Sequence, residues 1–187
     1  FRTGRRKLDH EPMQVGPDKV ILIDSLHGLY GDMLQDLDRE VVFKIYIEPL
    51  MQTKGPSGDF VRWTDLRLMR RMERDTLRRS YDARRTLEHW HYVRSSELRT
   101  IVPYINTVDY VINSALPYEL PIMKVRLYGR FCEWAEMYRD DPLRQDAYAR
   151  AKRVRDLLAG ILAVENEDAV PADSLLREFI GGSCYEY

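Results

Sequence analysis

The chain has 187 residues, a length that suits one domain with a substantial hydrophobic core. Hydrophobic residues make up 44% of it and charged residues 32%, and no apolar run approaches the roughly 20 residues of a membrane span. The formal net charge is −1, so the chain lacks the overall basic excess that is usual in nucleic-acid-binding proteins. We therefore expect neither a membrane nor a nucleic acid as a partner, and any anion site has to be local.

The cysteines and the first residues bear on the cellular compartment. Cys132 and Cys184 show neither a CxxC nor a metal-binding spacing, and two cysteines are too few for a disulfide framework. The opening FRTGRRKL is too highly charged for the apolar centre of a signal peptide. These features predict a cytoplasmic protein. Because Phe1 is not an initiator residue, we also expect the sequence to begin within a longer chain.

Strands and helices are predicted to alternate in the first part of the chain. Apolar runs favour strands at 20–23 (VILI), 41–48 (VVFKIYIE) and 109–115. A short helix is expected at 28–37, between the first two strands. The Gly and Pro residues of 52–59 (QTKGPSGD) predict a loop after the second strand.

Helical patterns dominate from residue 62 onward. The first covers 62–79, and the second covers 82–101 with Asp82 as its expected N-cap. Beyond Pro117 we expect two long helices and a short amphipathic one, at 119–139, 143–163 and within 171–180. The packing face predicted for the helix at 143–163 consists of Leu143, Ala147, Ala151, Val154, Leu158 and Ile161.

This alternation predicts an α/β fold with a mostly parallel sheet and a helical C-terminal extension. Residues 1–116 are expected to form the α/β core, and 117–187 the helical extension of the same domain. In such sheets, ligands bind beyond the carboxyl ends of the strands. We therefore expect Asp24, directly after the first predicted strand, and the loop at 52–61 to lie near a site that helix 62–79 can close over.

The helix at 62–79 (RWTDLRLMRRMERDTLRR) contains seven arginines and no lysine. At about 100° per residue, five of the arginines share one stripe and the apolar residues face the core. Asp75 and Arg79 form its only well-spaced ion pair, so the helix does not neutralise its own stripe. The stripe consists of Arg67, Arg70, Arg71, Arg74 and Arg78, and the apolar face of Leu66, Leu68, Met69, Met72 and Leu77.

Two interpretations of the arginine stripe stay open. It can be a solvated face or a set of ion pairs to other segments. It can also be a phosphate clamp, because the planar guanidinium fork binds two phosphate oxygens at once, whereas lysine is a point charge. Asp24 at a strand end is commonly a cap or turn residue, but it could also hold Mg²⁺ beside a phosphate. The clamp and this carboxylate together favour phosphoryl transfer.

Four segments, in order along the chain, resemble the uridine kinase and phosphoribulokinase family of P-loop kinases. GPDKVILIDSLHGL looks like its Walker-B-type segment, and RWTDLRLMRRMERD resembles its arginine-rich lid. YINTVDYVINSALPYEL looks like a later strand and turn of the family, and SLLREFIGGS is similar to the C-terminal tail of its long bacterial nucleoside kinases. The opening FRTGRR resembles a segment that contacts the nucleoside.

The resemblance implies part of a P-loop kinase fold, with residues 1–116 as the C-terminal portion of the kinase core and helix 62–79 as its lid. It implies ATP-dependent phosphoryl transfer to a nucleoside, with ATP and Mg²⁺ as cofactors, nucleotides and nucleosides as partners, and room for a homo-oligomer. The residues implied are Asp24 at the metal, Arg67, Arg70, Arg71 and Arg74 at the phosphates, and Phe1, Arg6, His89, Trp90 and Arg94 at the substrate.

The sequence departs from the family pattern at three places. No GxxxxGK[ST] occurs, so the loop that cradles the β and γ phosphates is missing from these residues. We expect it to precede them in the intact protein, and the 187 residues alone to be inactive. Asp24 and Ser25 stand where the family has Glu-Gly, and Gly4 where uridine kinases commonly have histidine. Two alternatives therefore remain: a catalytically inactive, nucleotide-binding regulatory domain, and an RNA- or anion-binding module.

Overall fold

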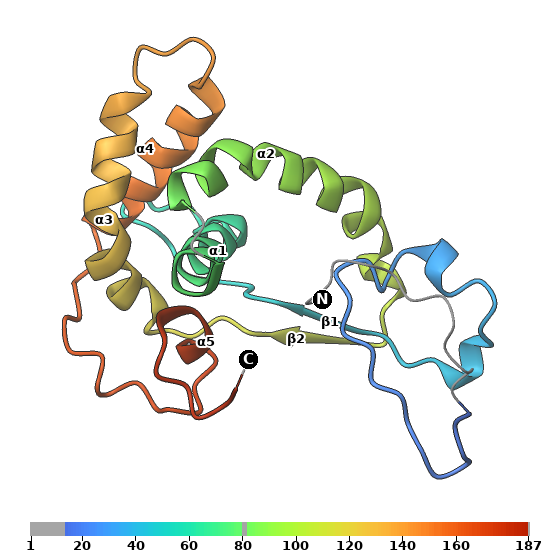
Figure 1. Ribbon diagram of the computed structural model, residues 1–187. Coiled ribbons are helices and arrows are strands. Elements are labelled where there is room, and N and C mark those ends of the chain that lie inside the picture. Colours follow the sequence, from blue (N-terminus) through green and yellow to red (C-terminus); the bar gives the residue numbers. More distant parts are fainter. Residues whose placement is uncertain (1–13, 80–81, 187) are drawn as a thin grey trace.

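The computed structural model describes residues 14–79 and 82–186, and these form a mixed α/β arrangement with a small sheet (Figure 1). The α/β class predicted from the sequence is therefore confirmed. In chain order the elements are η1 (Gly31–Met33), η2 (Arg39–Val41), β1 (Ile45–Glu48), α1 (Trp63–Arg79), α2 (Ala83–Thr100), η3 (Val102–Thr107), β2 (Tyr110–Asn113), α3 (Glu119–Met137), α4 (Gln145–Ala159) and α5 (Arg177–Ile180).

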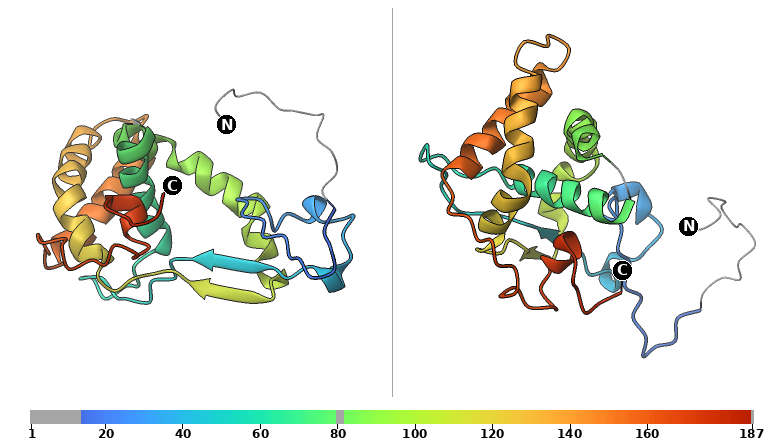
Figure 2. Two further views of the ribbon diagram at one scale, coloured as in Figure 1. Left: turned by 60° about the horizontal axis from the view of Figure 1, so that its bottom comes forward. Right: turned by 60° about the vertical axis from the view of Figure 1, so that its left-hand side comes forward.

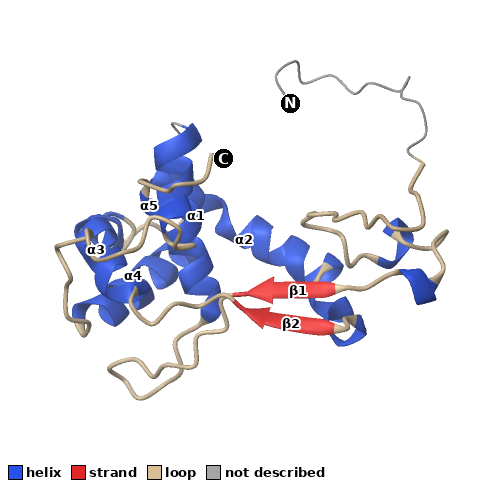
Figure 3. Ribbon diagram, turned by 90° about the horizontal axis from the view of Figure 1, so that it is seen from below, coloured by secondary structure: helices blue, strands red, loops and turns tan. Residues whose placement is uncertain are grey.

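The sheet of the described residues consists of β1 and β2, which run parallel. Ile45 is paired with Tyr110, and the chain crosses from one strand to the next through α1 and α2, as a parallel connection requires. Asp109 fixes the start of both strands, because its carboxylate accepts from the Lys44 backbone N–H at 2.7 Å. Both arrowheads in Figure 3 point toward the helical part of the molecule.

Residues 20–23 do not form the predicted strand. These residues have no regular secondary structure, and their side chains are largely exposed: Val20 is 94% and Leu22 90% accessible to solvent. A strand needs a neighbouring edge to pair its backbone groups, and an apolar run does not supply one. The helix predicted at 28–37 is likewise reduced to η1, and the run at 41–48 is a strand only from Ile45 onward.

The helices agree with the sequence more closely. α1 and α2 begin and end within one residue of the prediction, and the Asp82 carboxylate caps α2 by accepting from the Arg84 backbone N–H at 2.9 Å. α3 ends two residues early. α4 is shorter than predicted at both ends, and Leu143 precedes it and is 87% exposed, so its place in the packing face was wrong.

The hydrophobic core lies among the helices. α1 packs against α2, α3 and α5, while α4 packs against α2 and α3 (Figure 2). Leu66 and Leu68 of α1 are fully buried, whereas Leu77, predicted for the same face, is 52% exposed. Phe131 and Trp134 of α3 meet edge to face, with ring centroids 5.2 Å apart. Burial of one such side chain contributes about 1.5–3 kcal/mol, so this core holds α1 in place.

The segment at 14–44 lies beside the end of α2, on the side where the strands begin and away from α3 and α4 (Figure 1). The His27 ring nitrogen Nδ1 lies 3.1 Å from the Thr100 hydroxyl at the end of α2, and the rings of Tyr30 and Tyr104 meet edge to face. These contacts attach the segment to α2 and η3. Within residues 14–79 and 82–186, none of the helices combines the length and apolar character that crossing a bilayer requires.

Candidate functional site

α1 lies across the carboxyl ends of both strands. Arg67 of α1 forms an ion pair with Glu48, the last residue of β1, at 3.1 Å between Nε and Oε1. Arg70 donates from Nη2 to the backbone oxygen of Ser114, directly after β2, at 2.7 Å. This is the edge at which parallel sheets bind ligands, and the position expected for helix 62–79.

Arg67 lies in a cluster that joins α1, α2 and β1. Its Nη1 is 2.5 Å from an oxygen of Glu97, which is buried and also pairs with Arg94 one turn earlier in α2. The Trp63 ring centroid lies 5.9 Å from Cζ of Arg67 and 5.1 Å from Cζ of Arg94. Cations at this distance are attracted to an indole ring. Two arginines thus gather around Trp63 at the carboxyl edge of the sheet.

Glu48 is a buried carboxylate within this cluster. It is 4% exposed, and its Oε2 accepts from the Tyr46 hydroxyl at 2.7 Å. Burial raises the pKa of Glu48 above its ordinary value of 4.5, although Arg67 acts in the opposite direction. Burial, and then the bond to Glu48, raise the pKa of Tyr46 well above 10. Glu48 therefore depends on Arg67 for charge compensation.

Arg70 is buried and bound on every side. Its Nε donates to Oε1 of the fully buried Glu119 at 2.8 Å, and its two terminal nitrogens donate to the hydroxyl and the backbone oxygen of Ser114. Burial raises the pKa of Glu119, and the charge of Arg70 acts against that rise. All three guanidinium nitrogens thus contact protein, so Arg70 joins α1 to the end of β2 and the start of α3.

Arg71 and Arg74 keep more access to solvent, with side chains 41% and 32% exposed. Arg71 pairs at 2.6 Å with Asp75, one turn later in α1. The side chain of Arg79, the partner predicted for Asp75, lies outside the described part of the structure, so that pair stays a prediction. Nη1 of Arg74 lies 3.2 Å from an oxygen of Glu178 in α5.

All four arginines predicted for phosphate binding therefore contact a carboxylate. Arg67, Arg70 and Arg74 pair with other segments, as the ion-pair interpretation of the stripe expects. Arg71 pairs within α1, so the expectation that the helix leaves its own stripe unneutralised was wrong at this position.

These contacts define the site from the structure of this chain alone. Comparisons of the chain with protein-family models, curated proteins and solved structures found no match. The kinase resemblance therefore stays a prediction.

Asp24, the predicted metal ligand, does not lie with the arginines. It is exposed and belongs to the segment that contacts the end of α2 through His27. The cause is the missing strand at 20–23, which was expected to carry Asp24 to the carboxyl edge. In the described part of the chain, no three His, Cys, Asp or Glu side chains gather so as to hold a metal ion. Phe1 and Arg6 lie outside the described residues.

The other residues predicted to contact the substrate lie in different environments. Arg94 joins the cluster around Arg67, as described above. Trp90 is 4% exposed and belongs to the core, while His89 lies on the exposed face of α2. The loop at 52–61 leads from the carboxyl end of β1 into α1, so it borders the same edge of the sheet.

Sequence reasoning missed the carboxylates that face the arginines. Glu48 could have been found, because it directly follows an apolar strand, which is the signal that singled out Asp24. Glu119 and Glu178 carry no local signal, since they come from 49 and 104 residues beyond their arginines. Phosphate and carboxylate oxygens suit the same guanidinium fork. A phosphate can therefore replace a carboxylate on the more exposed arginines of α1.

Proposed function

We propose that the intact protein transfers a phosphoryl group from ATP to a nucleoside with the help of Mg²⁺, and that α1 supplies the cations around the phosphates. The observation that carries this proposal is the position of α1. Arg67 and Arg70 contact the carboxyl ends of β1 and β2, where ligands of parallel sheets bind. Phosphoryl transfer is accelerated mainly by cations placed around the migrating group.

Within this proposal the four arginines have different tasks. Arg71 and Arg74 contact phosphate, because they are the more exposed of the four. Arg70 holds α1 on the sheet through Glu119 and Ser114. Arg67 compensates the charge of Glu48 at the end of β1 and lies beside the phosphates rather than under them.

Two parts of the proposed reaction need groups beyond these contacts. No GxxxxGK[ST] occurs in the 187 residues, so the loop that cradles the β and γ phosphates has to come from other sequence. Asp24 can approach Mg²⁺ at the carboxyl edge only when residues 20–23 join the sheet. Their apolar side chains are 48–94% exposed, so the hydrophobic effect favours such a rearrangement when it also covers these side chains.

A second candidate is a nucleotide-binding domain without phosphoryl transfer. The position of Asp24, away from the arginines of α1, favours it, because phosphoryl transfer needs a metal ligand near the phosphates. An RNA-binding role has weaker support, since the net charge of the chain is −1 and binding along a nucleic-acid backbone depends on a basic surface.

The test uses the polypeptide as its gene encodes it, assayed for nucleoside-dependent formation of ADP from ATP and Mg²⁺ across a panel of nucleosides. We expect transfer to at least one nucleoside. The double variant Arg71→Ala/Arg74→Ala should lower kcat/KM by about 100-fold or more, because it removes cations from the transition state. Arg139→Ala is the matched control, since Arg139 is exposed, follows the end of α3 and pairs with Glu136 in its last turn.

Two results would contradict the proposal. ATP binding without transfer to any nucleoside would establish the second candidate. Unchanged kcat/KM in the double variant would remove the phosphate-binding role of Arg71 and Arg74. Thermal unfolding of each variant, compared with Arg139→Ala, separates loss of cations from loss of folding.

A further inference from the structure

The C-terminal segment contacts the same arginines of α1. Glu178 of α5 pairs with Arg74, and the ring of Phe179 lies 5.2 Å from Cζ of Arg70 and 5.9 Å from Cζ of Arg74. One buried aromatic ring is therefore shared by two guanidinium groups. Attraction to the ring restricts where these groups can lie, and so restricts where their N–H donors point.

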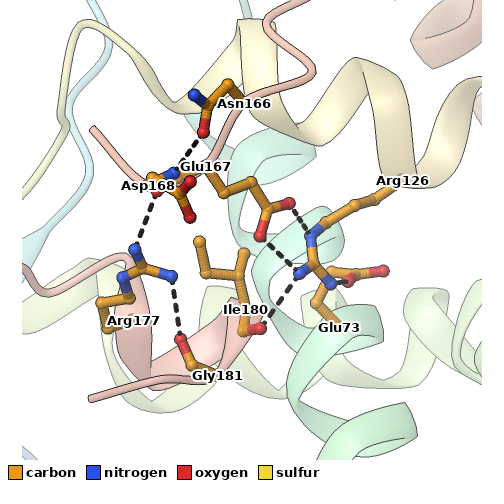
Figure 4. A network of polar contacts seen from close by, with 8 residues as sticks. All are labelled: Glu73, Arg126, Asn166, Glu167, Asp168, Arg177, Ile180 and Gly181. Carbon is orange, nitrogen blue, oxygen red and sulfur yellow. Dashed lines mark hydrogen bonds and ion pairs between the residues drawn. The ribbon is translucent and has the colours of Figure 1, made fainter. Parts of the chain in front are cut away.

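Arg126 of α3 anchors this segment to α1 (Figure 4). It donates from Nη1 to Glu73 of α1 at 2.9 Å, and from Nε and Nη2 to the two carboxylate oxygens of Glu167 at 2.7 and 2.9 Å. Its Nη2 also donates to the backbone oxygen of Ile180, the last residue of α5, at 3.0 Å. One side chain thus connects α3, α1, the loop before α5 and the end of α5.

Arg177 provides a second anchor at the beginning of α5. Its Nη2 donates to the backbone oxygens of Glu167 and Val170 at 2.8 and 2.7 Å, and its Nη1 lies 3.4 Å from the backbone oxygen of Gly181 (Figure 4). The backbone is therefore held on both sides of Glu178. The Glu178 carboxylate itself is 21% exposed and meets Arg74 at 3.2 Å, so it can turn away while α5 stays in place.

We propose that α5 is a positioning element for Arg74, one of the two arginines of α1 to which we assign phosphate binding, and for its neighbour Arg70. Phe179 keeps the guanidinium groups of Arg70 and Arg74 in place, and Glu178 occupies Arg74 until a polyphosphate displaces it. This inference rests on the proposed function in one respect, which is that α1 binds phosphates. Its consequence is a pair of opposite effects: Phe179 strengthens anion binding, whereas Glu178 weakens it.

The experiment measures binding of inorganic tripolyphosphate to the polypeptide as its gene encodes it, by calorimetry at one low salt concentration. Glu178→Gln should bind about two- to five-fold more tightly, the factor that corresponds to an exposed ion pair. Phe179→Leu should bind about three- to ten-fold more weakly through loss of the ring, and Phe179→Tyr should restore the affinity. Glu136→Gln removes the same charge from an exposed pair at the end of α3, and its affinity should match the wild type.

Each result decides the inference. Tighter binding by Glu178→Gln but not by Glu136→Gln supports it, as does binding that appears only in Glu178→Gln. Equal or weaker binding by Glu178→Gln overturns it, because a merely structural role of Glu178 would shift thermal unfolding without raising affinity. If neither the wild type nor Glu178→Gln binds tripolyphosphate, this inference and the phosphate-binding role of the arginines of α1 are both overturned. If the opposite effects occur and no nucleoside is phosphorylated, only the proposed function fails.

Discussion

Two regions of the molecule differ in how far they bury their apolar side chains. In the strand region (residues 14–48 and 102–113), Tyr46 and Glu48 are the only buried residues, and Ile47 is 59% exposed. In the helical body (residues 49–79, 82–101 and 114–186), α1 to α4 enclose a core with fully buried leucine, methionine and phenylalanine side chains. Helix packing, and not the sheet, therefore holds the arginine helix α1 in place.

The largest effect is expected where the two regions meet, at Arg70. Arg70→Met removes the cation beside Glu119, whose side chain is 0% exposed. Leaving one partner of a buried ion pair alone costs about 3–5 kcal/mol, so the free energy of unfolding should fall by that amount. Urea unfolding followed by circular dichroism measures it.

The double variant Arg70→Met/Glu119→Gln is the control for this prediction. It should recover at least half of the lost stability, because an amide needs no counter-charge. Arg139→Ala, at an exposed pair, should change the free energy of unfolding by less than about 0.5 kcal/mol. An unchanged unfolding midpoint in Arg70→Met would show that Glu119 does not depend on Arg70.

The same substitution in each region gives the second prediction. Leu127→Ala in α3 removes a fully buried side chain and should lower the free energy of unfolding by about 2–5 kcal/mol. Leu22→Ala, at a side chain that is 90% exposed, should change it by less than about 0.5 kcal/mol. Equal losses in the free energy of unfolding would contradict this difference between the two regions, since Leu22 would then be packed in solution.

The sequence predicted the helical body far better than the strand region, and the reason is physical. The apolar spacing in α1 and the cap at Asp82 act within a few residues, so they could be recognised along the chain. A strand at 20–23 depends on a neighbouring edge, which no local pattern reveals. The prediction for Leu143 was wrong for a similar reason. The apolar spacing of α4 extends back to Leu143, but the helix itself begins only at Gln145.

The candidate site was likewise predictable only in its local part, which is the arginine stripe on one helix. The stripe on α1 followed from helical geometry alone. Its partners Glu119 and Glu178 belong to tertiary structure, and so does the ring of Phe179 under Arg74. Periodicity identifies which side chains share a face, but it does not identify what the face meets.

The smallest effect concerns pH at the junction of the two regions. Burial raises the pKa of Glu48 and Glu119 above 4.5, so the folded state holds these protons more tightly than the unfolded state. Their contribution to stability is therefore present below pH 4.5 and is lost as pH rises through the raised pKa values. Asp109 acts oppositely below pH 3.8, because its bond with Arg39 lowers its pKa.

We therefore expect Glu48→Gln to flatten the decline in the free energy of unfolding above pH 4.5, measured by urea unfolding across a pH series. Glu136→Gln, at an exposed carboxylate, should leave the decline as it is in the wild type. A decline that is equally steep in Glu48→Gln would mean that Glu48 does not contribute to it.

The parallel pairing of β1 with β2 has a consequence for the order in which the chain folds. Lys44 and Asp109, which meet at the start of the strands, are 65 residues apart in the sequence. Closing so large a loop costs entropy before any strand contact forms, and contacts of high sequence separation slow folding. α1 and α2 form within their own segments and shorten the distance between the strands. We therefore expect the sheet to assemble late, on helices that have already formed.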